Sequence, residues 1–352
     1  MVVDDLIKSP GSWLTMGRDS AIAVSSRVRL ARNIRTCAFP GWAGDRESAE
    51  VCSRVREAGS LLPEMGSPLF LNMAGITDVD KKVLQERRLV SSELCDKSAG
   101  SGLMVSADEH ISIMINEEDH IRIQAVTPGL DLQTAWSRVS AADSGLERRI
   151  DYAFSRTLGY LTACPSNVGT GLRAGVMLHL AGLKLTEDLD SVIRGLSVLG
   201  FEIRGLFGEG TDAWGNMYQI SNRSTLGDSE ENILKNLTDV AEELIGHERD
   251  ARLRLLEARS RAVRDHVARA FGIVRHCEML SSREAIEFLS ILRFGAEMGM
   301  LKEISPGRIN RIMLLTQAGH LQKIAGKVIE AGERDAMRAR LVRDRLGNMK
   351  FY

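Results

Sequence analysis

The sequence lacks long apolar runs and any large excess of charge, and each absence excludes a class of protein. No run approaches the roughly 18 apolar residues of a membrane-spanning helix, and the N-terminus has no secretory signal pattern. The formal net charge is −1, so the chain has no basic excess with which to neutralise nucleic-acid phosphates. We therefore expect a cytoplasmic protein that binds neither a membrane nor, directly, nucleic acid.

Cysteine is also scarce. The five cysteines are odd in number and scattered, and no Cys-x-x-Cys pair occurs. This spacing argues against a disulfide framework or a structural zinc site and fits the reducing cytoplasm. What is present is an ordinary globular composition, 44% hydrophobic and 26% charged, in a chain of 352 residues that is long enough for two domains.

An acidic turn stands between two alternating runs. Residues 116–122 read Asn-Glu-Glu-Asp-His-Ile-Arg, and apolar residues alternate on either side, at 110–115 and 121–126. This period of two predicts two antiparallel strands joined by a tight connection. Three consecutive acids repel one another, and a magnesium-bound substrate or a guanidinium would relieve that repulsion. A solvated acidic turn is the alternative interpretation.

A third alternating run, residues 23–30, carries two arginines on one strand face, Arg27 and Arg29. Two neighbouring arginines make a good clamp for an oxyanion. A solvated strand face would show the same pattern.

A glycine- and hydroxyl-rich segment at residues 160–173 predicts a loop that enters an apolar helix at 174–183. Free backbone N–H groups and the helix dipole would favour an anion beside Arg173, in the first turn of that helix. Cys164 in the loop is either an activated thiol or buried packing. We expect His179, on the apolar helix, to be core packing.

A second glycine-rich segment lies between two predicted strands, at residues 201–207 and 217–221. Arg204 lies on the first strand, and Glu209 lies in the loop at 208–216. The loop is either a lid over a water-sensitive reaction or a plain flexible hairpin loop.

The remaining pattern is helical, and beyond about residue 250 strand signals and glycine loops largely end. In that helical part, Arg334 and Arg338 lie four residues apart on one face, which by itself predicts a solvated, self-paired helix surface. Helices are predicted at 46–65, 78–90, 131–158, 187–199 and 228–247, and then at 251–271, 281–299, 305–317 and 330–345.

The charged residues on these segments suit one kind of chemistry. Several fixed cations suit a nucleoside triphosphate. A guanidinium acceptor is protonated and barely nucleophilic, so two carboxylates, Glu118 and Glu209, would grip its planar fork, align it and take up its proton. A thiolate beside the guanidinium would add attraction. The cations are Arg27, Arg29, Arg122, Arg173 and Arg204.

Four of these segments, at residues 25–29, 116–122, 164–170 and 204–209, resemble the motif set of the phosphagen (guanidino) kinase family, in the family's order. The resemblance covers about residues 20–250. It implies an α+β, glutamine-synthetase-like fold, an antiparallel sheet flanked by helices, followed by an all-helical C-terminal domain. It implies Glu118, Glu209 and Cys164 as catalytic residues, and ATP with Mg²⁺ carried by the nucleotide rather than by protein ligands. The ATP-binding residues would be Ser25, Ser26, Arg27, Val28, Arg29, Arg88, Arg122, Arg173, Ala174, Gly175, Val176, Met177, Arg204, Gly205, Leu206, Phe207 and Gly208.

Only about 20 residues precede the first motif, and a helical C-terminal part follows the last one. In both features the chain is similar to the bacterial protein-arginine kinases of the family. This likeness implies a catalytic domain at 1–250, and a helical domain at 251–352 for phosphoarginine binding and dimerisation. The phosphoarginine-binding residues would be Arg334, Asp335, Arg338 and Ala339.

The same resemblance implies a cellular role and partners. The reaction would be phosphorylation of exposed arginines in proteins, which tags clients for Clp-type degradation and regulates the heat-shock response. Implied partners are the activator McsA, the repressor CtsR, the unfoldase ClpC and a second copy of the chain.

Two positions depart from the family pattern, and two other functions stay open. Arg88 and Met177 both stand where nucleotide-contacting histidines are expected in relatives. The alternatives are a kinase for free arginine or another small guanidino compound, and a phosphoarginine-binding adaptor without activity.

Overall fold

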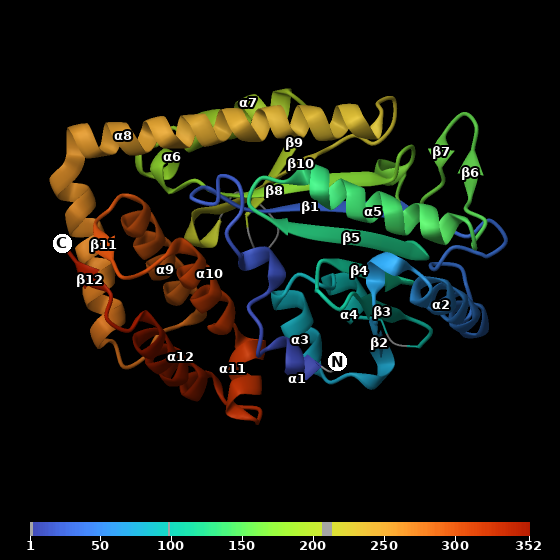
Figure 1. Ribbon diagram of the computed structural model, residues 1–352, viewed down its shortest axis with the longest axis horizontal. Coiled ribbons are helices and arrows are strands. Elements are labelled where there is room, and N and C mark those ends of the chain that lie inside the picture. Colours follow the sequence, from blue (N-terminus) through green and yellow to red (C-terminus); the bar gives the residue numbers. More distant parts are fainter. Residues whose placement is uncertain (1–2, 98, 206–212) are drawn as a thin grey trace.

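An eight-stranded antiparallel sheet forms the centre of the molecule (Figure 1). The computed structural model describes residues 3–97, 99–205 and 213–352. The strand order is β2-β3-β4-β5-β1-β8-β10-β9, and β4 and β5 form the predicted hairpin around the acidic turn. The predicted antiparallel sheet flanked by helices is confirmed. The strands are β1 Ala23–Arg32, β2 Leu69–Asn72, β3 Gly102–Val105, β4 Ile111–Ile115, β5 Ile121–Pro128, β8 Leu172–His179, β9 Phe201–Gly205 and β10 Met217–Asn222.

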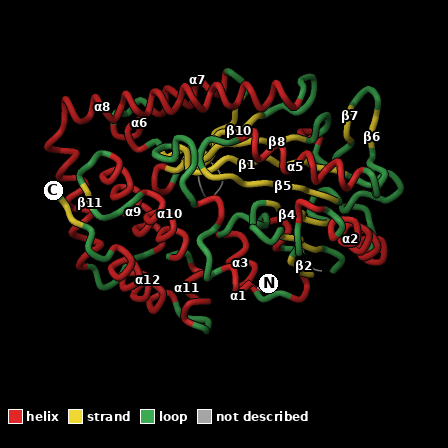
Figure 2. Tube along the Cα trace, viewed as in Figure 1, coloured by secondary structure: helices red, strands yellow, loops and turns green. Residues whose placement is uncertain are grey.

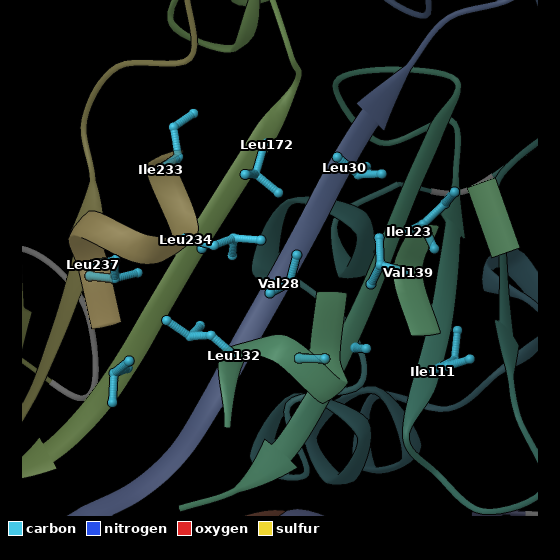
Figure 3. Close-up of a cluster of buried hydrophobic side chains, with 14 of the residues drawn as sticks. Val28, Leu30, Ile111, Ile123, Leu132, Val139, Leu172, Ile233, Leu234 and Leu237 are labelled. Atoms are coloured by element: carbon cyan, nitrogen blue, oxygen red, sulfur yellow. The ribbon is translucent and has the colours of Figure 1, made fainter. Parts of the chain in front are cut away.

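One face of the sheet, called here the first face, is covered by α2 (Asp45–Ser60), α5 (Leu132–Glu147) and the start of α8 (Glu230–His276). Alternation along β1 turns Val28 and Leu30 toward these helices, and both side chains are fully buried (Figure 3). Removing this apolar area from water is the main driving force for placing the helices on the sheet. The helix side chains of the same cluster include Leu132, Val139, Ile233, Leu234 and Leu237.

The opposite face, called the second face, has two separate covers. At β2 to β4 it is covered by α1 (Val3–Leu6), α3 (Asp78–Glu86) and α4 (Ser92–Cys95). Around β1, β5, β8 and β10 the C-terminal helices pack against it, in a cluster that includes Val24 of β1 and Met177 of β8. The second face therefore holds two apolar blocks with the polar residues of the central strands between them.

The C-terminal helices from the end of α8 onward are called here the helical region. No loop separates this region from the sheet domain, because α8 belongs to both. α8 is 47 residues long, bends where Arg259 leaves helical geometry (φ −136°), and runs through the domain boundary predicted at residue 250 (Figure 2). Among the described residues, no helix has a stretch long and apolar enough to cross a membrane. The other helices are α6 Ala181–Leu185, α7 Leu189–Val198, α9 Ser282–Glu297, α10 Pro306–Leu315, α11 Ala318–Ala325 and α12 Ala331–Leu346, and the short strands β11 Leu301–Lys302 and β12 Lys350–Phe351 pair at the end.

Side-chain caps fix where α8 and α9 begin. Ser229 caps α8 by accepting a hydrogen bond from the backbone N–H of Asn232. At α9, Ser281 and Glu284 form a complete capping box. Each cap satisfies backbone N–H groups that have no partner within the helix.

Two predicted helices were wrong in whole or in part. Residues 174–183, predicted as a helix, belong mostly to β8, a central strand buried on both faces, whose continuous apolar run hides the period of two. The helix predicted at 131–158 ends at Glu147, and a short hairpin of β6 (Phe154–Ser155) and β7 (Gly159–Tyr160) follows. Arg173 is consequently a strand residue and has no helix dipole beside it.

His179 links the sheet to the helical region and is fully buried, as the sequence predicted. Its Nε2 lies 2.8 Å from Oγ of Ser290 on α9. Burial, with repulsion from Arg293 and Arg252, lowers the pKa of His179 well below its ordinary value of 6.5. The folded protein therefore holds this ring neutral at pH values where the unfolded chain binds a proton.

We expect the free energy of unfolding to fall as the pH drops below 6.5, by up to about 1.4 kcal/mol per pH unit from this ring alone. His179→Asn should make the decrease between pH 7 and 5 shallower in urea unfolding. His247→Asn is the control, because His247 is exposed on α8. An equal pH dependence in the wild type and His179→Asn would contradict the assignment.

Candidate active site

A cleft of about 810 Å³ opens on the second face, between α3 and α4 on one side and the helical region on the other. All five predicted arginines line it, as does Arg88. Strand alternation explains this convergence, because each arginine has sheet neighbours that point into the core of the first face. The register of the strands also brings arginines together, since Arg29 on β1 lies directly opposite Arg173 on β8.

The electrostatics of the cleft favour an anion. Burial, together with Arg88, Arg122 and Arg173, lowers the pKa of Arg27 to about 9. Burial and the neighbouring arginines also lower the pKa of Arg29 well below its ordinary value, and its Nε has no hydrogen-bond partner among the described residues. A polyanion in the cleft would remove this repulsion and supply the missing acceptors.

Two acids that the sequence interpretation did not select balance part of this charge. Glu117 lies 2.5 Å from Nη1 of Arg122 and also accepts a hydrogen bond from Ser91. Glu202 on β9 bridges Arg173 and Arg204, with 2.5 Å to Nη2 of the latter. The signal for Glu202 was its spacing of two from Arg204, which puts both side chains on one strand face.

The acidic turn uses its three acids differently. Asn116 takes a positive φ of 57° to close the turn, and Glu117 points to Arg122. Asp119 is buried and accepts hydrogen bonds of 2.6 Å from the Nδ2 of Asn33 and the backbone N–H of Ala163. Glu118 is left exposed at the tip, so it is the acid of the turn that a substrate can reach.

The bond from Ala163 to Asp119 also brings the next residue, Cys164, to the turn. Partial desolvation of the carboxylate and the charge of Asp119 raise the pKa of Glu118, while a hydrogen bond with the Cys164 side chain acts in the opposite direction. Sγ of Cys164 lies 3.0 Å from Oγ of Ser166. The structure thus joins Glu118 and Cys164, which are far apart in the sequence. Four other predicted site residues, Leu206, Phe207, Gly208 and Glu209, lie outside the described residues.

The other predicted ATP residues take three kinds of position in the structure. Met177 and Gly205 line the cleft. Gly175 lies beneath it on β8, where a Cβ would come within 2.6 Å of Nε2 of Gln219. Ser25, Ser26, Val28, Ala174 and Val176 are buried in the sheet, and Ser26 donates to the carbonyl of Gly129.

Arg88, at the end of α3, reaches the cleft through an unusual backbone conformation. Its φ is +61°, and its guanidinium carbon lies 4.7 Å from the ring centre of Trp13. Burial lowers the pKa of Arg88 to about 10. The ring of Trp13 is fixed in turn, because its Nε1 donates to the carbonyl of Arg87.

The residues predicted to bind phosphoarginine lie on α12, and Arg338 is already fully engaged with its neighbours. Arg338 is buried and donates to the carbonyls of Thr316 and Leu280, and its Nη1 lies 2.5 Å from Oδ1 of Asp335. Arg334 donates to the carbonyl of Ile329. Ala339 is buried, whereas the side chain of Asp335 is 30% exposed.

The described residues include no group of three or more His, Cys, Asp or Glu side chains that is arranged to hold a metal ion. Six of the residues that line the cleft are arginines, whose guanidinium groups bind phosphate.

Comparison with known proteins identifies the family. A family profile described as ATP:guanido phosphotransferase, C-terminal catalytic domain, matches residues 50–251. A protein-arginine kinase of Halothermothrix orenii is 42% identical over 348 residues, 98% of this chain and 99% of that protein. The chain belongs to the protein-arginine kinases of the ATP:guanido phosphotransferase family.

A second family profile, another relative and a solved structure support the same assignment. A second profile, described as the protein-arginine kinase McsB C-terminal domain, matches residues 260–351. The protein-arginine kinase of Halalkalibacterium halodurans is 44% identical over 336 residues, 94% of this chain and 93% of that protein. The crystal structure of a lombricine kinase matches with a TM-score of 0.59 and 26% identity, over 71% of this chain and 70% of that one. The predicted family and fold are confirmed, and the chain is an ATP-dependent guanido phosphotransferase.

We expect Arg29→Gln to weaken the binding of Mg-ATP about 30-fold or more, because it removes a positive charge of the cleft that we expect to bind the phosphates. The same change should raise the melting temperature of the ligand-free protein, since the other arginines repel Arg29. Thermal unfolding with and without Mg-ATP measures both effects. Arg35→Gln is the control, because Arg35 is an exposed residue on the same segment of chain. An unchanged ATP-induced stabilisation in Arg29→Gln would show that the phosphates bind elsewhere.

Proposed function

We propose that this chain transfers the γ-phosphoryl group of ATP to the guanidino group of arginine side chains in proteins. One observation carries the proposal: an exposed carboxylate, Glu118, joined to Cys164 at the acidic turn that also holds Arg122 of the arginine-lined cleft. Relatives that match nearly the whole chain are named protein-arginine kinases. That name supports a protein acceptor.

The acceptor end follows from the chemistry of a guanidinium. Its nitrogen is protonated at neutral pH and barely nucleophilic. Glu118 would accept its N–H groups, hold the fork in line with the γ-phosphorus and take up a proton as the N–P bond forms and the P–O bond to ADP breaks. Glu209 would serve as the second carboxylate, and Cys164 would add attraction for the cation.

The donor end follows from the arginine cluster. Arg27, Arg29, Arg122, Arg173 and Arg204 would bind the phosphates, and Glu202 would release its two arginines when a phosphate replaces it. Magnesium would arrive with ATP and neutralise phosphate charge. The remaining cleft residues, Arg88, Met177 and Gly205 among them, would contact the rest of the nucleotide.

The wider role belongs to the same proposal. The modified arginines would mark proteins for Clp-type degradation and regulate the heat-shock response, with McsA, CtsR and ClpC as partners and a homodimer as the assembly. Five free thiols suit a cytoplasmic location. A phosphoarginine bound at α12 would have to compete with Arg338 for the carboxylate of Asp335.

We expect Glu118→Gln to lower transfer to an unstructured arginine-containing protein by about 100-fold or more while ATP still binds. The measurement counts acid-labile, alkali-stable phosphate in that protein and, separately, in free arginine. Glu57→Gln, an exposed acid on α2, is the control. Label on free arginine alone would favour the small-guanidine kinase, and no label on either acceptor would favour the phosphoarginine-binding adaptor.

We also expect a distinct pH dependence of kcat/KM. Glu118 must be ionised to take up a proton, and its pKa is raised above its ordinary value of 4.5 by burial and Asp119. The rate should therefore fall on the acid side with a midpoint above 4.5. An Asp119→Asn variant should move that midpoint down, since it removes a neighbouring negative charge. A midpoint that does not move would exclude Glu118 as the titrating group.

A further inference from the structure

Two exposed apolar projections are attached to the acidic turn that carries Glu118. The first is the loop at residues 38–44, called here the tryptophan loop, where Trp42 is 90% exposed. The second is the β6–β7 hairpin, where Phe154 is 48% and Leu158 is 47% exposed. Figure 1 shows this hairpin and α2, which follows the tryptophan loop, at the same end of the molecule. Neither phosphate binding nor proton transfer requires any of these three side chains.

The tryptophan loop is held to the acidic turn by His120, whose ring is fully buried. Nδ1 of His120 accepts a hydrogen bond from the backbone N–H of Ile34 (3.1 Å), so Nε2 carries the proton and donates it to the carbonyl of Ala38 (2.9 Å). Phe39 meets the same ring edge-on, and its carbonyl accepts from the backbone N–H of Trp42 (2.8 Å). Trp42 therefore belongs to a closed turn that is anchored beside the acids.

The hairpin is held to the same turn through Asn33, the residue after β1. Nδ2 of Asn33 donates to the carboxylate of Asp119 (2.6 Å) and to the carbonyl of Leu161, directly after β7 (3.1 Å). On the hairpin, the ring of Phe154 meets that of Tyr160 edge-on, with 5.2 Å between the centroids. Both projections are thus connected to the acidic turn by hydrogen bonds from fixed side chains.

A protein substrate must bring its backbone close to these projections. The guanidinium of the target arginine has to reach Glu118, so the residues on both sides of that arginine pass over the surface around the turn. An extended chain covers about 3.3–3.6 Å per residue, so three residues on each side of the arginine span about 20 Å in all. Free arginine has no such flanking residues. Contacts with the two projections would therefore distinguish a polypeptide from the free amino acid.

The chemistry of the projections matches apolar side chains. An indole and a phenyl ring provide a large contact area at a small cost in conformational entropy, and such rings are enriched where proteins bind partners. An unstructured segment has no core in which to bury its own apolar side chains. Contact with the projections removes apolar area of both partners from water. The partner that fits is an extended, unstructured segment with apolar residues beside the arginine.

We propose that Trp42, Phe154 and Leu158 form a docking surface for the apolar residues that flank the target arginine in an unstructured polypeptide. The inference rests on the proposed function, since it takes Glu118 as the carboxylate that binds the acceptor. The docking surface selects the polypeptide, and the acidic turn binds the arginine itself. Because hydrogen bonds connect both projections to the turn, the docked chain and Glu118 keep a fixed spacing.

The test compares two synthetic peptides, each with one central arginine, flanked by leucines in one and by serines in the other. Phosphate transfer from Mg-ATP to each peptide gives kcat and KM separately. The wild type should prefer the leucine peptide about tenfold in kcat/KM. Trp42→Ala should raise KM for the leucine peptide about tenfold and leave the serine peptide within about twofold, because only the flanking contacts are lost.

A second variant and a control accompany this comparison. Phe154→Ser, on the other projection, should also weaken the leucine peptide alone, and its effect should add to that of Trp42→Ala because the two side chains lie on separate projections. Leu253→Ala removes an exposed apolar side chain from α8 and should change the kinetics of neither peptide.

Each remaining outcome would overturn a specific part of the proposal. Equal kcat/KM of the wild type for the two peptides would refute the docking surface and leave the role of Glu118 intact. An equal loss on both peptides in Trp42→Ala would show that this residue acts through the shape of the turn. A smaller assembly of Trp42→Ala in light scattering, with an unchanged peptide preference, would show that a second copy of the chain covers the surface. If the wild type phosphorylates neither peptide nor an unstructured protein, the proposed function fails together with this inference.

Discussion

Repulsion among arginines on one face of the sheet is the constraint on which the rest of the structure depends. Strand alternation and register force Arg29 and Arg173 to face each other, with Arg27 and Arg122 nearby. Such a cluster is tolerated because Glu117 and Glu202 offset part of its charge and because the buried strands below fix the backbone. Part of the repulsion between the arginines remains. A bound polyanion would relieve it, and this relief would add to the affinity of the cleft for the polyanion.

The second important feature is that the three acids of the acidic turn lie in different environments and make different contacts. Three adjacent acids would be expected to share one environment, yet each has a separate role. Glu117 pairs with an arginine of the cleft, and Asp119 holds the segment that carries Cys164. Because both neighbours are engaged, Glu118 is held out at the tip with a raised pKa. The engaged neighbours fix the turn, so the carboxylate of Glu118 is left exposed beside Cys164, where a substrate can reach it.

The helical region is more than an appendage to the sheet. It covers part of the second face, is tied to α3 through Glu86, and lines part of the cleft. α12 connects to the same seam, since Arg338 donates to the carbonyl of Thr316, directly before the cleft-lining Gln317. Any shift of these helices would change the walls of the arginine-lined cleft.

The sequence alone determined the period-two strands at β1, β4 and β5, the arginines they carry, the acidic turn and the change to helices near residue 250. These are local patterns, set by one strand or one turn. It misread β8, because a strand buried on both faces loses the alternation that identifies strands. Only the tertiary structure decided which acid of the turn is exposed, which acids pair with arginines, and that α9 and α11 line the cleft. Those properties depend on contacts between segments far apart in the chain, and no local period encodes them.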